Sequence, residues 1–221
     1  ECFVYVASTS SQAFVAQGTS GNSARFSIAI DGGLWWAQIG SAVINAGTPV
    51  ANTWNYLAAT FDGSTLTLYV NGTSVGSVST TTSAQNTTLA IGNYGSAWTT
   101  SYHVVGYISN VRVSNLVRTI FNIPAAPYTS DANTVALLCQ SNRFIDVGPS
   151  AYALTTNGVP SVQRFNPFGA SVTYSTDVLG GSGYFDGTNG HLSATVGAIG
   201  TQPFTFECWI YNTVQNNQPI F

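Results

Sequence analysis

Methionine and lysine are absent from the 221 residues, and charged side chains of any kind make up only 6% of the chain. Ordinary soluble domains carry about 25% charged residues, so the polar surface here must come from serine, threonine, asparagine, glutamine and glycine. The five basic residues are all arginines, they form no cluster, and the formal net charge is −3. Binding to a nucleic-acid backbone depends on clustered positive charge, so we expect no nucleic-acid partner.

Long apolar runs are also missing. None approaches the roughly 20 residues that a membrane-spanning helix needs, and we expect no membrane insertion. No signal-peptide pattern is present, because the chain opens directly in a strand-like segment. The lack of any methionine, including an initiator, predicts an internal or processed segment of a longer protein.

The residues of common catalytic and metal sites are scarce and scattered. The three cysteines, Cys2, Cys139 and Cys208, each lie in an apolar strand-like run, where cysteine behaves as a small buried hydrophobe. Their spacing fits neither a disulfide framework nor a zinc site. The two histidines are His103 and His191, and the sequence contains no Gly-x-Ser-x-Gly motif whose serine could form a catalytic triad with either of them. No phosphate-binding glycine motif is present.

Acidic residues are equally dispersed, and no two of the eight lie within eight positions of each other. Glycoside hydrolysis needs two carboxylates about 5 to 9.5 Å apart, which only convergence through the fold would supply. We therefore expect no enzyme. Asp62 and Asp186 have neighbouring amides that suit Ca²⁺, but neither lies in a dense acidic loop, and a turn-forming role explains them more simply. We predict no cofactor and no metal, and leave Ca²⁺ open.

Alternation of polar and apolar residues is abundant. From Arg25 to Ile30 the apolar side chains fall on one face, and Asp31-Gly32-Gly33 then turns the chain. The clearest unit is a meander in which Trp54–Phe61 ends in Asp62-Gly63 and Thr65–Val70 ends in Asn71-Gly72. Both dipeptides favour type I′ hairpin turns, which need positive φ angles.

Helical signals are missing, and the remaining apolar runs also read as strands. Further strands are expected at residues 89–92, 104–113, 135–139, 183–185, 191–194 and 204–211. Short strands separated by turn residues predict an all-β fold, an antiparallel β-sandwich of the jelly-roll type.

An internal repeat organises the chain. Its opening residues, Glu1-Cys2-Phe3-Val4-Tyr5, recur 206 residues later as Glu207-Cys208-Trp209-Ile210-Tyr211. The two copies predict the same strand in successive modules of a tandem array. We divide the chain into residues 1–121, the central and C-terminal part of one module, a proline-containing linker at 122–133, and residues 134–221, the N-terminal part of the next.

A second arrangement stays open. Residues 134–221 could close against residues 1–133 as a permuted completion of the same sandwich. One strand copy would then be surplus and free to assemble with a neighbouring sheet.

Several segments resemble laminin-G-like domains of the concanavalin-A-like lectin and glucanase superfamily. Residues 54–63 followed by 68–72 resemble the central hairpin, residues 106–113 the closing strand, and residues 184–187, 191–192 and 204–211 the opening strands. Tyr56 stands where the family usually carries histidine. The resemblance covers nearly the whole chain in permuted order and implies a sandwich of two antiparallel sheets.

The Gly-Tyr-Ile-Ser-Asn-Val-Arg run at 106–112 and the proline-rich connector resemble modules of bacteriophage tail and virion proteins. This resemblance implies a non-catalytic structural or adhesive module, such as part of a tail fibre, appendage or surface decoration. We expect a virion or extracellular location and neighbouring copies of the same protein as partners. The alternative is a carbohydrate-binding adhesin domain of a secreted bacterial protein, with cell-surface glycans as partners.

Carbohydrate binding would use a loop between residues 93 and 102. Trp98 and Tyr94 could stack on a sugar face, Asn93 could donate or accept hydrogen bonds, and Tyr102 closes the loop. A second aromatic candidate is the pair Trp35 and Trp36, one of which must face outward in a strand. These rings could equally fill the sandwich ends or the interfaces between modules.

Overall fold

The computed structural model describes residues 1–17, 26–81, 89–93, 102–118, 122–141, 143–157, 160–163 and 165–168. The chain divides into two compact units, Glu1–Gly181 and Ser182–Phe221, and every described residue belongs to the first. The strands expected at 183–185, 191–194 and 204–211 therefore lie outside the described residues.

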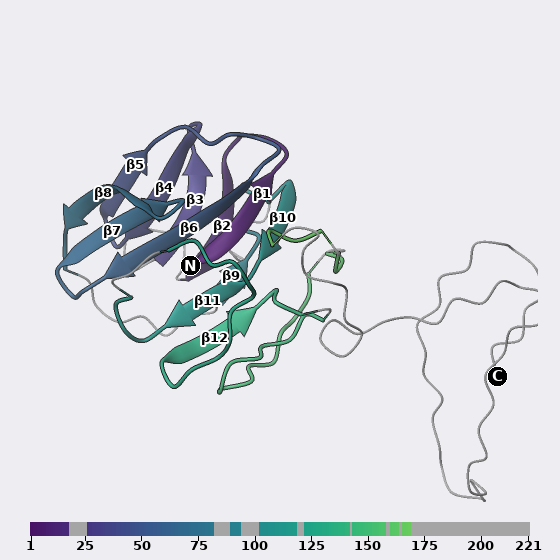
Figure 1. Cartoon of the computed structure of the whole chain (residues 1–221). Coiled ribbons are helices and arrows are strands. Elements are labelled where there is room, and N and C mark those ends of the chain that lie inside the picture. Colours follow the sequence, from purple (N-terminus) through teal and green to yellow (C-terminus); the bar gives the residue numbers. More distant parts are fainter. Residues whose placement is uncertain are drawn as a thin grey trace, which may run out of the picture. The chain divides into compact units, whose positions relative to one another are not determined.

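Every regular element among the described residues is a β-strand (Figure 1). The strands are β1 (Cys2–Val6), β2 (Gln12–Gln17), β3 (Phe26–Asp31), β4 (Leu34–Ile39), β5 (Ala42–Ala46), β6 (Trp54–Phe61), β7 (Thr65–Val70), β8 (Thr73–Ser79), β9 (Leu89–Ile91), β10 (Gly106–Ser109), β11 (Val111–Ser114) and β12 (Thr134–Leu138). The part of the chain that the structure describes contains no helix long and apolar enough to cross a membrane.

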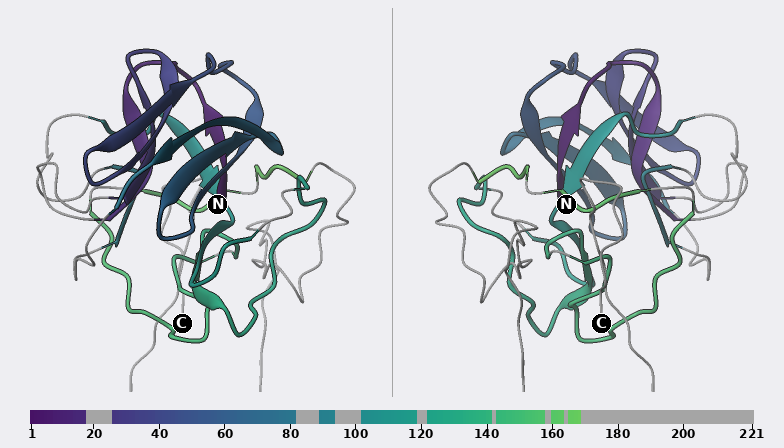
Figure 2. Two further views of the ribbon diagram at one scale, coloured as in Figure 1. Left: turned by 90° about the vertical axis from the view of Figure 1, so that its left-hand side faces the viewer. Right: turned by 90° about the vertical axis from the view of Figure 1, so that its right-hand side faces the viewer.

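The strands form two five-stranded antiparallel sheets and a separate ribbon. The first sheet has the order β10-β1-β6-β7-β8, the second has the order β5-β4-β3-β2-β9, and β11 pairs with β12. The two sheets lie face to face (Figure 2), and one apolar cluster is drawn from both of them. Its fully buried members include Val4, Leu57 and Leu68 from the first sheet and Phe14 and Ile30 from the second. The prediction of an antiparallel β-sandwich is confirmed.

The hairpin turns follow the sequence, with one difference. Asn71 and Gly72 have φ angles of 50° and 80°, as a type I′ turn requires. The connection between β6 and β7 is longer than a two-residue type I′ turn. In it, the Oδ1 atom of Asp62 accepts hydrogen bonds from the backbone nitrogens of Ser64 and Thr65 at 2.8 and 2.7 Å. This side chain forms an Asx-type turn, and Gly63 takes the positive φ of 97°.

The strand expected at residues 104–113 is divided into β10 and β11. Asn110 separates them with a φ of 52°, and its side chain accepts a 2.9 Å hydrogen bond from the backbone nitrogen of Tyr128. Its own backbone nitrogen donates to the Cys139 carbonyl at 3.0 Å. These bonds satisfy the buried residue in a left-handed conformation that asparagine tolerates, so β11 leaves the first sheet and pairs with β12.

The predicted linker at 122–133 contains no strand, and it connects β11 to β12, which pairs antiparallel with it. Tyr128 within this segment is only 7% exposed. The Arg118 guanidinium is paired with Asp131 at 2.8 Å. The segment is thus fastened to the strands on either side of it. The assignment of residues 134–221 to a second module remains a prediction.

Candidate functional site

Strand β1, which contains the first copy of the repeated sequence, occupies an interior position in the first sheet. β1 pairs with β10 on one side and with β6 on the other. Cys2, Val4 and Val6 are fully buried in the core between the sheets, so the alternating residues Glu1, Phe3 and Tyr5 face outward.

The Glu1 carboxylate lies at the centre of a buried polar cluster. The Glu1 side chain is 6% exposed and the Arg112 side chain 13%. The Nε atom of Arg112 donates to Oε1 at 2.7 Å, and the Tyr128 hydroxyl donates to Oε2 at 3.0 Å. The Tyr56 hydroxyl also donates to Oε2. The Arg112 guanidinium carbon lies 3.8 Å from the centre of the Tyr128 ring, which adds a cation–π contact.

These contacts fix the charge states of the cluster. Burial raises the pKa of the Glu1 carboxyl, but the adjacent amino group, the Tyr56 hydrogen bond and Arg112 outweigh it, so this pKa lies below its ordinary value. Burial, followed by the hydrogen bond to Glu1, raises the pKa of Tyr56. Burial and the Glu1 charge raise the pKa of Tyr128. At neutral pH the cluster therefore holds an ionised carboxylate between two protonated phenols.

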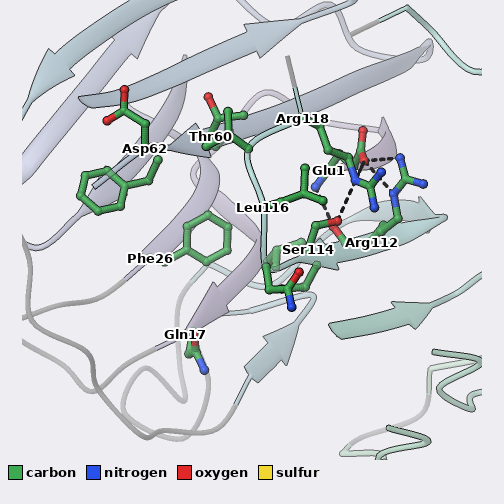
Figure 3. A pocket seen from close by; sticks show the side chains of 15 residues that line it. Glu1, Gln17, Phe26, Thr60, Asp62, Arg112, Ser114, Leu116 and Arg118 are labelled. Atoms are coloured by element: carbon green, nitrogen blue, oxygen red, sulfur yellow. Dashed lines mark hydrogen bonds and ion pairs between the residues drawn. The ribbon is translucent and has the colours of Figure 1, made fainter. Parts of the chain in front are cut away.

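A second arginine extends the cluster across β11 (Figure 3). The Nε atom of Arg118 lies 3.7 Å from Oε1 of Glu1 and donates to the Ser114 hydroxyl at 2.8 Å. Its Nη2 atom donates to both oxygens of Asp131, at 3.0 and 2.8 Å. The hydrogen bonds from Arg118 and then Thr134 lower the pKa of Asp131 to about 2. The two acids and two arginines thus alternate in sign and join β1, β11 and the connection before β12.

Aromatic rings cover the outward side of the same sheet. The Tyr5 ring lies 5.8 Å from those of Trp54 and Tyr107, and all three contact Phe165 at 4.9 to 5.2 Å between ring centres. Tyr107 and Phe165 remain 38% and 47% exposed. The side chains of the repeated strand therefore anchor both a charge cluster and an aromatic face.

The residues predicted for carbohydrate binding are described in part. Tyr102 donates its hydroxyl to Oδ1 of Asp31 at 3.1 Å, and its carbonyl accepts from the Ala13 nitrogen at 2.9 Å. The Asn93 amide lies 3.4 Å from Nδ1 of His103, which places both ends of the loop together. Tyr94 and Trp98 lie outside the described residues, as do the predicted assembly residues Glu207, Cys208, Trp209, Ile210 and Tyr211.

The tryptophan pair obeys strand alternation. Trp35 is 3% exposed in the core, where its ring lies 6.2 Å from that of Phe14. Trp36 packs with Tyr102 against a small cluster of three alanines, Ala13, Ala16 and Ala29. Two aromatic rings thus cover small, buried side chains on the outward face of the second sheet.

The described acids outside the Glu1 cluster are engaged in local structure. Asp31 accepts from the hydroxyls of Ser11 and Tyr102, and Asp62 closes a turn. Asp146 accepts three backbone N–H bonds, from Leu137, Gly148 and Tyr152, at 2.8 to 3.0 Å. Within the described ranges, no three side chains of His, Cys, Asp or Glu gather as a metal site would require.

The partners of Glu1 were missed by sequence reasoning. Tyr56, Arg112 and Tyr128 come from three distant parts of the chain, and nothing in their local spacing links them. One signal was available: Arg112 is a charged residue between Val111 and Val113 in a chain with few charges, and a charge in such a strand requires a partner.

Comparison with known proteins places the first half of the chain in a family. The model of the concanavalin A-like lectin/glucanases superfamily matches residues 1–123. A structure of domains LG4-5 of the mouse laminin alpha1 chain is similar at 19% identity, with a TM-score of 0.41. The similarity covers 50% of this chain and 33% of that one, so the chain spans about a third of that structure's length. No curated protein matches the chain.

Proposed function

The chain belongs to the concanavalin A-like lectin/glucanases superfamily, and we propose that it is a non-catalytic structural or adhesive module of a tandem-repeat protein. Such a module would serve an extracellular or virion assembly, for example a tail fibre, an appendage or a surface decoration. Its main partners would be neighbouring modules and copies of the same protein.

The observation that carries this proposal is the use of the repeated strand. Glu1 is the residue that holds Arg112, Tyr56 and Tyr128 together, and the repeat places Glu207 at the equivalent position. A buried glutamate is costly unless its charged partners are also present. The second copy of the sequence would therefore need the same partners around Glu207, which a second sandwich of the same kind would provide.

The chemistry of the described acids supports a non-catalytic role. A glycosidase needs one protonated carboxyl group at its working pH. Glu1 and Asp131, the two acids that Arg118 brings together, both have lowered pKa values. Each therefore lacks the proton that a general acid must donate at neutral pH.

The size and location of the native polypeptide test the proposal. We expect an antibody against this chain to detect a polypeptide several times larger than 23.2 kDa, in the extracellular or particle fraction. A native polypeptide near 23.2 kDa that remains inside cells would contradict both the tandem array and the location.

A carbohydrate-binding adhesin is the second candidate. It is favoured by the two aromatic rings, Trp36 and Tyr102, that lie on the outward face of the second sheet over three buried alanines, because the flat faces of aromatic side chains can stack on sugar rings. A glycan array should then give a signal that Trp98→Ala and Tyr102→Ala both remove, whereas Tyr152→Ala, an exposed aromatic elsewhere, should leave it unchanged. If the glycan array gives no signal, the carbohydrate-binding candidate is rejected and the structural role remains.

A further inference from the structure

Strand β1 stops pairing with β6 before β6 itself ends. The last β6 residue with a partner on β1 is Leu57, opposite Cys2, whereas β6 remains paired with β7 as far as Phe61. On the other side, Glu1 and Arg112 exchange backbone hydrogen bonds of 2.9 and 2.8 Å. Among the described residues, no strand therefore lies between the end of β6 and β11, in line with β1. We call this position the strand gap.

The strand gap coincides with a cavity of about 560 Å³ (Figure 3). The Glu1–Arg112 pair closes one end of it, and the cavity continues along β6 to Asp62. The side chains on its core-facing wall are apolar and only partly covered: Phe26, Ala59, Phe61 and Val113. This cavity therefore opens directly into the space between the sheets.

The backbone on both borders is oriented to receive a strand. On the β7 side, the Tyr56 backbone nitrogen donates to the side-chain Oδ1 of Asn71, and the Asn71 backbone nitrogen donates to the Tyr56 carbonyl. In an antiparallel strand the bonding direction alternates between successive residues, so Ala59 and Phe61 direct their N–H and C=O groups into the gap. By the same rule Ser114, two residues after Arg112, also faces the gap.

The internal repeat supplies the sequence that fits. The residues directly before the second copy of the strand are Phe204, Thr205 and Phe206, followed by Glu207. We propose that the strand gap is the seat of an extended tripeptide of this sequence, Phe-Thr-Phe, entering in line with β1 directly before Glu1. It would join β11 and β12 to the first sheet and close the core.

Side-chain alternation agrees with this assignment at each position. Because the Glu1 side chain faces outward, the residue before it faces the core, the next faces outward, and the third faces the core. The two phenylalanines would therefore enter the cavity, one between Ala59 and Val113 and the other beside Phe61. The threonine would lie on the outer side between Thr60 and Ser114, a pairing that favours hydroxyl contacts.

This inference deepens the proposed tandem array, on which it rests for the source of the tripeptide, since each repeat would provide the strand that completes the next. It also identifies the sequence pattern that fits the cavity directly before Glu1: a short β-strand with phenylalanine at alternate positions. Main-chain hydrogen bonds to β6 and β11 would hold this segment in place, and the two apolar positions would select its side chains, as in strand addition.

The experiment adds the sequence of residues 201–206, Thr-Gln-Pro-Phe-Thr-Phe, before Glu1 of the full chain. We expect the Tm to rise by about 5 to 10 °C, because two phenylalanine side chains leave water. Hydrogen exchange at the amides of Ala59 and Phe61 should slow at least about tenfold, because these groups gain strand partners.

The matched control carries Thr-Gln-Pro-Thr-Phe-Thr, which turns its single phenylalanine to the outer side. It should give less than half of the Tm rise. Equal effects of both extensions, or unchanged exchange at Ala59 and Phe61, would overturn the proposal. So would a dimer of the unextended chain that already protects these amides, because a second copy would then fill the gap.

Failure here is distinguishable from failure of the proposed function. A large native polypeptide combined with an unresponsive gap would keep the array and reject its completion by this strand. If the extension stabilises the chain but the native polypeptide has a mass of 23.2 kDa, the strand gap would still be a binding site for a strand, and the tandem array would be rejected.

Discussion

Replacement of Arg112 by methionine should destabilise the module strongly, because it leaves the Glu1 carboxylate buried without its main partner. Methionine retains much of the apolar stem of arginine and removes only the guanidinium. Breaking a buried ion pair by removing one partner costs about 3–5 kcal/mol. Arg112 also contributes the contact over the Tyr128 ring, worth about 0.5–2 kcal/mol.

The expected loss lies near the lower end of that range, at about 3 kcal/mol. Two tyrosine hydroxyls still donate to Glu1, and the Arg118 guanidinium remains 3.7 Å away. Urea unfolding followed by tryptophan fluorescence measures this loss, and an unchanged m-value would show that the two-state comparison holds.

The double variant Glu1→Gln/Arg112→Met separates the ion pair from the packing of arginine. Glutamine is neutral and nearly isosteric with glutamate, so the double variant should be more stable than the sum of the single losses predicts, by at least about 1 kcal/mol. Additive losses, or a loss below about 1 kcal/mol for Arg112→Met alone, would refute the assignment of a buried, coupled pair.

The same pair predicts a pH dependence of stability. The Glu1 pKa in the folded state is lowered from its ordinary 4.5. Its contribution is therefore present above pH 4.5 and is lost as the pH falls through the folded-state pKa. In Arg112→Met the folded-state pKa rises, so unfolding curves measured between neutral and acidic pH should show a smaller loss of stability on acidification than those of the parent.

Three further predictions concern other contacts. Gly106→Ala should cost at least about 3 kcal/mol in urea unfolding, because a Cβ atom there would lie 2.0 Å from the Tyr5 carbonyl oxygen and the φ angle is 152°; a stable variant would contradict the strand register. Burial raises the pKa of Cys2 to about 12 and of Cys139 to about 11, so iodoacetamide at pH 8 should label both at least about 100-fold more slowly than in denaturant, as peptide mass spectrometry would measure. Asp146→Asn should cost about 2 kcal/mol, because one of its three backbone donors would face an amide nitrogen; an unchanged urea midpoint would count against that role.

The strands and turns with strong local signals were predictable from the sequence. Asp31-Gly32-Gly33 and Asn71-Gly72 both mark hairpins, and β3, β6 and β7 follow the expected alternation. β2 and β5 were missed. In β2 the register shifts between Ala13 and Val15, and Phe14 and Val15 both enter the core, so the period-two pattern is interrupted by a bulge.

The Glu1 cluster was not predictable, because it depends on tertiary proximity. Glu1 and Tyr128 are 127 positions apart, and the break at Asn110 that turns β11 away from the first sheet is fixed by a bond to Tyr128. A local pattern has no information about such bonds. The repeat did identify Glu1 as a residue of interest, although its role is set by side chains that the repeat does not contain.

At one edge of the sandwich, the outer strands of the two sheets approach each other closely at a glycine, which has no side chain. Gly76 in β8 lies against Ile44 in β5, and a Cβ atom at this glycine would approach the isoleucine methyl to 2.8 Å. These are the outermost strands of the two sheets, and edge strands are the sites where proteins aggregate unless they are protected, often by lysine. A chain without lysine lacks that protection. Because Gly76 lets the two edge strands approach each other closely, it leaves less room for a further strand at this edge, a form of edge protection that requires no charge.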